Sequence, residues 1–342
     1  MPVLPSLIVV VRVTTECPLQ CKFCGYSRDL EYARTDIDAV RLVRFGKVLS
    51  SYQSSSNRRI LVSWLGGEPY RWSELLNVSR QFRQFNLQLG ITTNGIALAS
   101  ARCRQQTIEL FSQVTVSVDG LERQHDAVRQ SPGLFRRLRK NVRCLRAEDV
   151  SQRLLLRCNT VLMRSNIDQF ERFCEEIAEW GFDELTFNQL GGNDRPAFFR
   201  DNRLLPQQVE SFARQLPGIQ RRLRKQGLVI RGTDQYLRRF SESARDVPIV
   251  IEDCRPAEDF LFVSEAGAVS PCSFTSNEYP VPLEDVSNAH LLSELTSVFG
   301  CLRMNRRAKA CADCHATHVF DKFAFNEQAL HSIRALQKNG IK

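Results

Sequence analysis

The chain has 342 residues, of which 43% are apolar and 25% are charged. This balance is typical of globular proteins and argues against a disordered, collagen-like or coiled-coil chain. The mean hydropathy is −0.28, and no uncharged apolar run approaches the length of about 18 residues that a membrane span needs. Arg12 interrupts the apolar run from Leu7 to Val11, and no signal-peptide flanks surround it, so we expect a cytoplasmic protein without membrane partners.

Basic residues outnumber acidic ones by 47 to 38, which gives a formal net charge of +9. The two densest basic segments, 136–143 and 221–225, contain apolar residues at the spacing of an amphipathic helix. We interpret both as helices with a solvated basic face. Nucleic-acid binding is the weaker alternative, because no aromatic residues alternate with these charges as a stacking surface requires.

Six short β-rich runs alternate with stretches of helical periodicity along the first half of the chain. The predicted strands are Leu7–Thr14, Ile60–Leu65, Leu87–Thr92, Val114–Val118, Leu154–Val161 and Glu184–Asn188. The predicted helices are Asp38–Ser50, Trp72–Phe85, Ala101–Phe111, Leu134–Arg146, Asn166–Trp180 and Pro206–Gln226. This alternation predicts an α/β protein with a parallel sheet, either doubly wound or closed into a full or partial barrel.

The alternation stops after Gly192, and a less regular region that contains cysteines follows. We therefore predict two domains, residues 1–230 and residues 231–342. In the second, 257–264 and 268–271 flank a short turn with Gly267, which predicts a β-hairpin. A serine-rich loop is expected at 50–56.

Twelve cysteines are many for a cytosolic chain, where metal ligation is a better interpretation than disulfides. Four of them, Cys103, Cys144, Cys158 and Cys174, stand singly within apolar patterns and are predicted to be small buried hydrophobic residues. The others gather near the start, in a later segment and near the end of the sequence.

Cys17, Cys21 and Cys24 lie on one loop directly after the first predicted strand. Three thiolates can hold three irons of a four-iron cluster, which leaves the fourth iron free to bind a cofactor. A zinc knuckle is the alternative, but zinc needs a fourth Cys or His and none is nearby.

This cysteine spacing, with Phe23 before the third cysteine, resembles the radical S-adenosylmethionine (SAM) enzymes. Gly66-Gly67-Glu68-Pro69 ends the second strand, as in the family motif whose backbone and carboxylate receive the methionine ammonium group. The family fold, a partial (β/α)6 barrel similar to a TIM barrel, fits the six predicted strands.

Two further motifs of the family lie at the ends of the third and fourth strands: Thr92-Thr93-Asn94-Gly95 and Ser117-Val118-Asp119-Gly120. By this resemblance, Asn94 and Ser117 lie close to SAM, and Arg157 pairs with the cofactor carboxylate. Arg157 is equally compatible with an ordinary strand arginine. His125 and Asp126 are interpreted as a helix-capping pair rather than as an acid–base pair.

Cys254, Cys272, Cys311 and Cys314 resemble the SPASM/twitch pattern, which binds an auxiliary iron–sulfur cluster in a smaller C-terminal α+β domain. The absence of further cysteines after Cys314 is typical of the shorter twitch version. A zinc site that includes His315 or His318 is the alternative interpretation. Cys301 is either a spare thiol or a substitute ligand.

The resemblance implies two [4Fe-4S] clusters, SAM as cofactor, and an electron donor such as a reductase or a protein of the flavodoxin or ferredoxin type. It also implies that SAM is cleaved reductively to a 5′-deoxyadenosyl radical, which abstracts hydrogen from the substrate.

Four thiolates would saturate the second cluster, so net oxidation of a peptide or peptide-derived natural product is the favoured outcome. Dehydrogenation of an alcohol in an aminocyclitol-like metabolite is an alternative. An alternative of another class is a structural metal-binding protein that contacts nucleic acid. The first strand begins near the start of the sequence, so no preceding peptide-recognition domain is expected.

Overall fold

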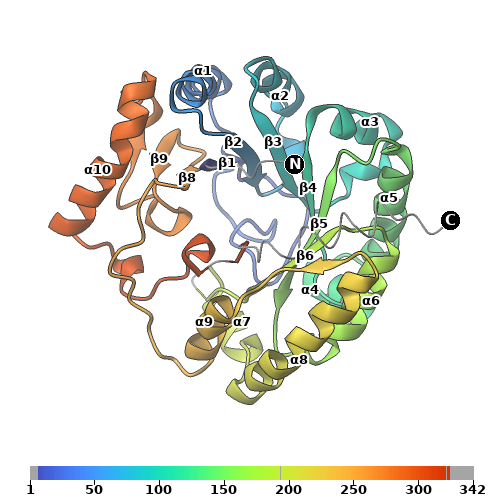
Figure 1. Ribbon diagram of the computed structural model, residues 1–342. Helices are drawn as coiled ribbons and strands as arrows, with labels where there is room; N and C mark the ends of the chain where they lie inside the picture. Colours follow the sequence, from blue (N-terminus) through green and yellow to red (C-terminus); the bar gives the residue numbers. More distant parts are fainter. Residues whose placement is uncertain (1–6, 193, 321, 324–342) are drawn as a thin grey trace.

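The computed structural model describes residues 7–192, 194–320 and 322–323, and in this part of the chain a curved mixed sheet has helices on its outer side (Figure 1). The strand order is β10-β9-β8-β1-β2-β3-β4-β5-β6-β7. The strands are β1 (Leu7–Thr14), β2 (Ile60–Gly66), β3 (Gln88–Thr93), β4 (Gln113–Ser117), β5 (Leu155–Leu162), β6 (Glu184–Gln189), β7 (Val229–Ile230), β8 (Phe260–Val263), β9 (Ala268–Ser270) and β10 (Val281–Pro282). The α-helices are α1 (Ala39–Ser56), α2 (Leu75–Gln84), α3 (Ala101–Leu110), α4 (Glu122–Arg129), α5 (Leu134–Glu148), α6 (Phe170–Glu179), α7 (Pro196–Asn202), α8 (Pro206–Lys225), α9 (Asp234–Ala244) and α10 (Ala289–Asn305).

Strands β1 to β6 are parallel neighbours in chain order, with helices in the connections between them. The predicted α/β class with a partial barrel is therefore confirmed. All six predicted strands are present, and no end differs from the prediction by more than one residue. Parallel strands that are covered on one side by helices bury continuous apolar rows, and this pattern made them visible in the sequence.

The two faces of β6 separate the helical layer from the inside of the barrel. Phe187 packs against Phe170 of α6 and Phe212 of α8, with ring centroids 5.7 and 5.4 Å apart. Because successive strand residues point to opposite faces, Thr186 and Asn188 face the other side, the barrel lumen. Thr186 Oγ1 donates a hydrogen bond there to Asn159 Oδ1 of β5, at 2.9 Å.

The predicted hairpin forms as β8 and β9, which pair antiparallel. Its turn places Gly267 at a φ of 77°, a left-handed conformation that glycine adopts without strain. Strand β8 also pairs in parallel with β1, so the hairpin extends the barrel sheet at the edge opposite to β7. The boundary near residue 230 stays a prediction, and residues 324–342 of the second predicted domain lie outside the described residues.

The serine-rich segment 50–56 is helical, so the predicted loop is wrong. Helix α1 continues to Ser56, and its serine hydroxyls donate to backbone carbonyls one turn earlier, as Ser54 does to Ser50 at 3.0 Å. This local bonding lets serine remain in a helix although its intrinsic propensity is modest. The first predicted helix is thus longer than its apolar pattern indicated.

Both basic segments lie on amphipathic helices, as predicted. Leu138 and Val142 of α5 and Leu223 of α8 are buried in the core, and the basic residues around them are mostly exposed. Within the described part of the chain, no helix has the length and apolar character that crossing a membrane requires.

We expect Phe187→Ala to lower the free energy of unfolding by about 3–5 kcal/mol, because it opens a cavity among several aromatic rings. Denaturant unfolding of the full chain measures this change. Met304→Ala is the matched control, since Met304 is 80% exposed and its truncation should change the free energy by about 0.5 kcal/mol at most. Equal effects of the two substitutions would contradict the packing described here.

Candidate functional site

Cys17, Cys21 and Cys24 lie together on the loop that leaves β1. Cys21 is buried and the other two are half-buried. Burial, with a smaller contribution from the charge of Cys24, raises the pKa of Cys17 to about 11 and that of Cys21 to about 12. Three thiolates together on this loop are therefore stable only beside a strong positive charge, such as the irons of a cluster.

A buried guanidinium lies near this loop. Arg129 of α4 lowers the pKa values of all three thiols by its charge. Although burial opposes its ionisation, Asp119 raises the pKa of Arg129, and the two groups are 2.7 Å apart. Arg129 and Asp119 were not predicted as site residues, although Asp119 belongs to the motif that ends β4.

The glycine pair after β2 allows the cysteine loop to lie directly on the end of that strand. Gly67 N donates to Thr14 O, and Glu68 N donates to Glu16 O, both at 2.8 Å. A Cβ on Gly66 would lie 2.4 Å from Thr14 O, and one on Gly67 would lie 2.3 Å from Glu16 O. Any side chain at either position would therefore push the cysteine loop away from the sheet.

Glu68 connects the ends of β2 and β3. Its carboxylate accepts hydrogen bonds from Thr93 Oγ1 and from Asn94 N, both at 2.7 Å. Burial raises the pKa of Glu68, against the effect of these hydrogen bonds. An ammonium group placed beside this carboxylate would favour its ionised form, which is compatible with the predicted role of Glu68 toward methionine.

Asn94 is buried at the end of β3, and its Nδ2 has no hydrogen-bond partner among the described residues. A buried amide without a partner costs free energy, so this N–H group is available to a ligand. Ser117 ends β4 and is half-buried, Phe23 is half-buried on the cysteine loop, and Pro69 is buried. The predicted cofactor residues from β1 to β4 thus share the carboxyl edge of the sheet, and their polar groups fit a cluster with SAM.

Arg157 lies apart from this edge, near the start of β5. It pairs with Glu184 of β6 at 2.7 Å, and its register partner on β4 is Thr115. A contact between Arg157 and the cofactor carboxylate remains a prediction. His125 and Asp126 have structural partners: His125 Nδ1 accepts from Asp119 N, and Asp126 accepts from Phe135 N at the start of α5.

The second set of cysteines lines one mostly apolar cavity, although more than 55 positions separate its first and last members in the sequence. Its empty volume is about 540 Å³, which includes open solvent at the mouth. Burial, with smaller contributions from the charges of the other three thiols, raises the pKa of Cys314 to about 11. These four are Cys254, Cys272, Cys311 and Cys314.

His315 and His318 also line this cavity, whereas Cys301 is exposed on α10 and does not. The His318 ring stacks on the Phe260 ring, with centroids 4.4 Å apart. No group of three or more described His, Cys, Asp or Glu side chains converges on a point suited to a single metal ion. Ligands of a cluster bind separate irons and need not converge in this way.

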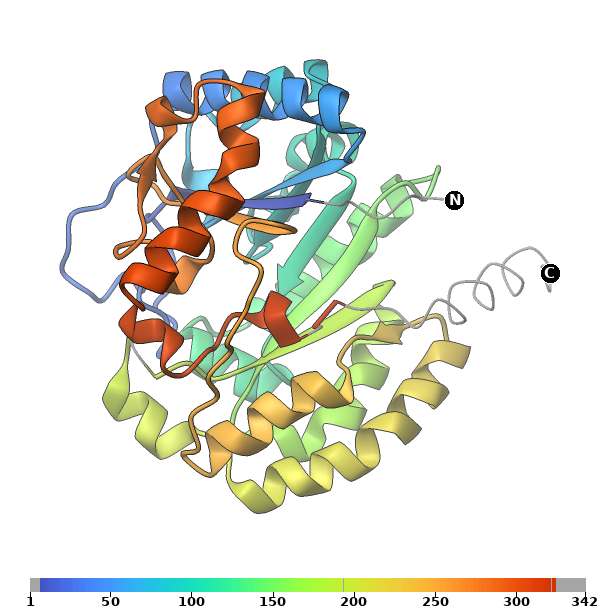
Figure 2. The ribbon, with the colours of Figure 1, turned by 60° about the vertical axis from the view of Figure 1, so that its left-hand side comes forward.

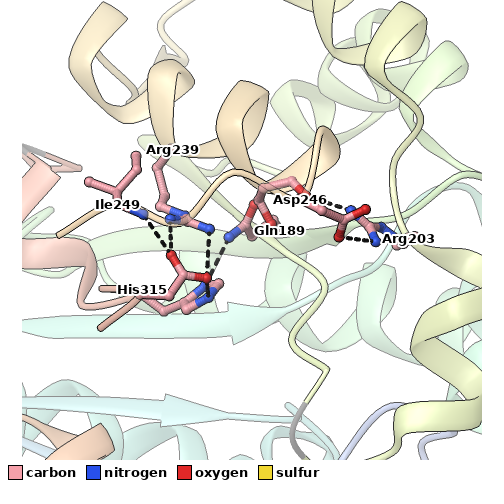
Figure 3. Close-up of polar contacts among 8 residues, drawn as sticks. Gln189, Arg203, Arg239, Asp246, Ile249 and His315 are labelled. Carbon is pink, nitrogen blue, oxygen red and sulfur yellow. Dashed lines mark hydrogen bonds and ion pairs between the residues drawn. The ribbon is translucent and has the colours of Figure 1, made fainter. Parts of the chain in front are cut away.

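A polar network fixes the turn between Cys311 and Cys314 against the barrel (Figure 3). Asp313 pairs with the buried Arg239 of α9 at 2.6 Å and accepts from Ile249 N at 3.0 Å. His315 joins the network through Asp313 and through Gln189, the last residue of β6, each at 3.1 Å. The cysteine turn is thereby connected to the carboxyl end of a barrel strand.

The remaining single cysteines differ in burial. Cys158 and Cys174 are fully buried, as predicted, and burial raises the pKa of each well above its usual value. Cys103 and Cys144 are only half-buried.

Comparison with known structures gives the same architecture. SuiB of Streptococcus suis bound to SAM superposes with a TM-score of 0.65 and 16% identity, over 90% of this chain and 72% of that one. The enzyme anSMEcpe with bound AdoMet and the Cp18Cys peptide gives 0.60 and 16%, over 97% and 99%. The chain has the fold of the radical SAM enzymes. The fold that the motifs predicted, a radical SAM barrel with a C-terminal extension, is thus confirmed.

Sequence comparison gives a match to part of the chain. A PqqA peptide cyclase of Ruegeria pomeroyi is 25% identical over 183 residues, which are 53% of this chain and 46% of that protein. The chain thus spans about half the length of this curated relative. No model of a known protein family matches the chain.

We expect Asp313→Asn to lower the free energy of unfolding by about 1–3 kcal/mol, because Arg239 would remain buried without its counterion. Asp246→Asn is the matched control from the same figure: Asp246 pairs with Arg203 at 2.5 Å but is 76% exposed, so its loss should cost about 1 kcal/mol or less. Urea unfolding of both variants measures the difference. An Asp313 variant as stable as the control would show that the network does not hold the turn.

Proposed function

We propose that this protein is a radical SAM enzyme that oxidatively modifies a peptide. The observation that carries the proposal is the set of groups at the carboxyl edge of the sheet: three cysteines after β1, Glu68 after β2 and Asn94 after β3. Barrel enzymes assemble their active sites at this edge. The fold shared with SAM-bound SuiB and anSMEcpe supports the same assignment.

In this proposal Cys17, Cys21 and Cys24 hold a four-iron cluster, and Glu68 and the backbone near Gly66 and Gly67 receive the methionine end of SAM. When bound and reduced, this pair supplies a 5′-deoxyadenosyl radical that abstracts hydrogen from carbon. The chain itself contributes binding and orientation. Arg129 favours the thiolate forms, and Glu68 supplies a buried negative charge opposite an ammonium group.

A peptide substrate is supported by the names of the similar proteins. The matched Ruegeria protein is called a PqqA peptide cyclase, and SuiB has a structure with its precursor peptide SuiA. The structure of anSMEcpe holds the Cp18Cys peptide. We propose the same substrate class here, together with an external electron donor for the first cluster.

The four cysteines around the second cavity support an auxiliary cluster as electron acceptor. With all four thiolates bound to iron, no iron would be free for substrate, so the cluster would take an electron rather than a ligand. We therefore propose net oxidation, and we assign this role to the region after residue 230.

The first test measures the iron and sulfide content per chain. After anaerobic reconstitution we expect about eight irons and eight sulfides per chain, since each cysteine set suits a four-iron cluster. The combined Cys17→Ala, Cys21→Ala and Cys24→Ala variant should retain about four. Cys301→Ser, at an exposed thiol outside the cavity, should change nothing. Stoichiometric zinc with about four irons in the natural sequence would eliminate the auxiliary cluster.

The second test follows SAM. The reduced protein should release 5′-deoxyadenosine slowly without substrate, and Cys24→Ala should abolish this release because the first cluster loses a ligand. Cys314→Ala should retain it, since Cys314 lies on the other cavity. Chromatography of the quenched reaction measures the product. Release at the original rate by Cys24→Ala would show that the first cluster is assigned wrongly.

The third test examines the product. A peptide substrate should become lighter by two hydrogens, with one SAM consumed per turnover. One hydrogen atom would leave in 5′-deoxyadenosine, and the second would leave as a proton to solvent and an electron to the auxiliary cluster. Cys272→Ala should stop product formation while label still moves from substrate to 5′-deoxyadenosine, as mass spectrometry can follow. A redox-neutral product, or substrate label in recovered SAM, would contradict net oxidation.

A further inference from the structure

The segment after the auxiliary cysteines crosses the open side of the barrel (Figure 2). On one side, His318 stacks on Phe260 of β8. On the other, His315 bonds to Gln189 of β6, and Val319 O accepts from Gln235 of α9 at 3.3 Å. The segment therefore connects the β8 side of the sheet with the β6 side, and it brings Lys322 to the lumen.

Lys322 reaches the lumen from this segment and is only 5% exposed. Its Nζ donates to Asn188 Oδ1 at 2.7 Å and to Asn159 Oδ1 at 3.3 Å. Both amides belong to the row of β5 and β6 side chains that face the lumen, and both residues are half-buried. An ammonium group has three donors, so this geometry leaves one N–H of Lys322 for another acceptor.

In the described part of the chain, cations outnumber carboxylates around Lys322. Glu184 already pairs with two guanidinium groups, those of Arg157 and Arg231. Among the described residues, no carboxylate lies within ion-pair distance of Lys322. Phe323 lies between the cations, with its ring 5.0 Å from Lys322 Nζ and 5.2 Å from Arg157 Cζ.

Burying an ammonium group without a counterion costs free energy, because the charged form loses its water. Burial, and then the charge of Arg157, lower the pKa of Lys322 to about 7. An anion beside the ammonium group would remove both the cost and the shift.

We propose that Lys322 is the cation of a carboxylate-binding subsite in the barrel lumen, in which Asn159 and Asn188 orient the ammonium group. The assignment of this carboxylate to the substrate rests on the proposed function. The cysteine loop and the Glu68 motif follow β1 and β2, whereas Lys322 lies at β5 and β6. A substrate with an acidic side chain or a terminal carboxylate would thus bind across the lumen from the cofactor residues.

The test measures denaturant unfolding of the reconstituted full chain with glutarate as the probe and neutral glutaramide as its matched control. Glutarate should raise the unfolding midpoint of the natural sequence and of Lys322→Arg, because a ligand of the folded state stabilises it. The rise should be lost in Lys322→Met and kept in Lys225→Gln, a control at an exposed lysine of α8. Equal effects of glutarate and glutaramide, or an undiminished glutarate effect in Lys322→Met, would overturn the subsite.

Without any probe, Lys322→Met should be at least as stable as the natural sequence, because it removes a buried charge that no described carboxylate compensates. A clear loss of stability would instead show that Lys322 is a structural residue. SAM and decarboxylated SAM distinguish the source of the carboxylate. If Lys322→Met weakens stabilisation by SAM but not by decarboxylated SAM, the carboxylate belongs to the cofactor. The assignment of the carboxylate to the substrate is then overturned. These readouts do not require SAM cleavage, so failure of the proposed function would appear separately.

Discussion

The backbone contact between the cysteine loop and the glycine pair after β2 is the constraint on which the rest of the site depends. Thr14 O and Glu16 O accept the N–H groups of Gly67 and Glu68, so the loop crosses directly over the end of the neighbouring strand. The same contact sets the position of the first cysteine and of the Glu68 carboxylate. Neither can move without the other, which gives a rigid base for a ligand that touches both.

The site contains acidic groups whose ionised forms are disfavoured by burial. Thiols and a carboxyl group that lose water favour their neutral forms. Arg129 acts against this tendency at all three cysteines and at Glu68. Its own burial is tolerated because Asp119 compensates its charge, and Asp119 is fixed in turn by the N–H of Val161 on β5. Val161, near the end of β5, therefore helps through Asp119 and Arg129 to favour the thiolate forms of the cysteines that follow β1.

The sequence predicted the strands and the motif residues because both depend on local patterns. Apolar runs define the strands, and the motifs follow directly at their ends. Helix α10 was missed although Leu292, Leu295 and Phe299 are buried at helical spacing, because its outward face is also partly apolar. Arg129 and Lys322 left no local signal. Their partners, Asp119 and the amides of Asn159 and Asn188, are brought close only by the fold.

The segment from Cys314 to Lys322 links the proposed auxiliary cluster to the proposed substrate subsite. Cys314 and Lys322 are eight positions apart in the sequence, yet one lines the auxiliary cavity and the other reaches the barrel lumen. A substrate held by Lys322 would therefore contact the same short segment that supplies auxiliary ligands. Gln189 and Arg239 anchor this segment near its start, through His315 and Asp313. In the proposed function, binding in the lumen and the position of the electron acceptor would therefore be coupled through this short segment.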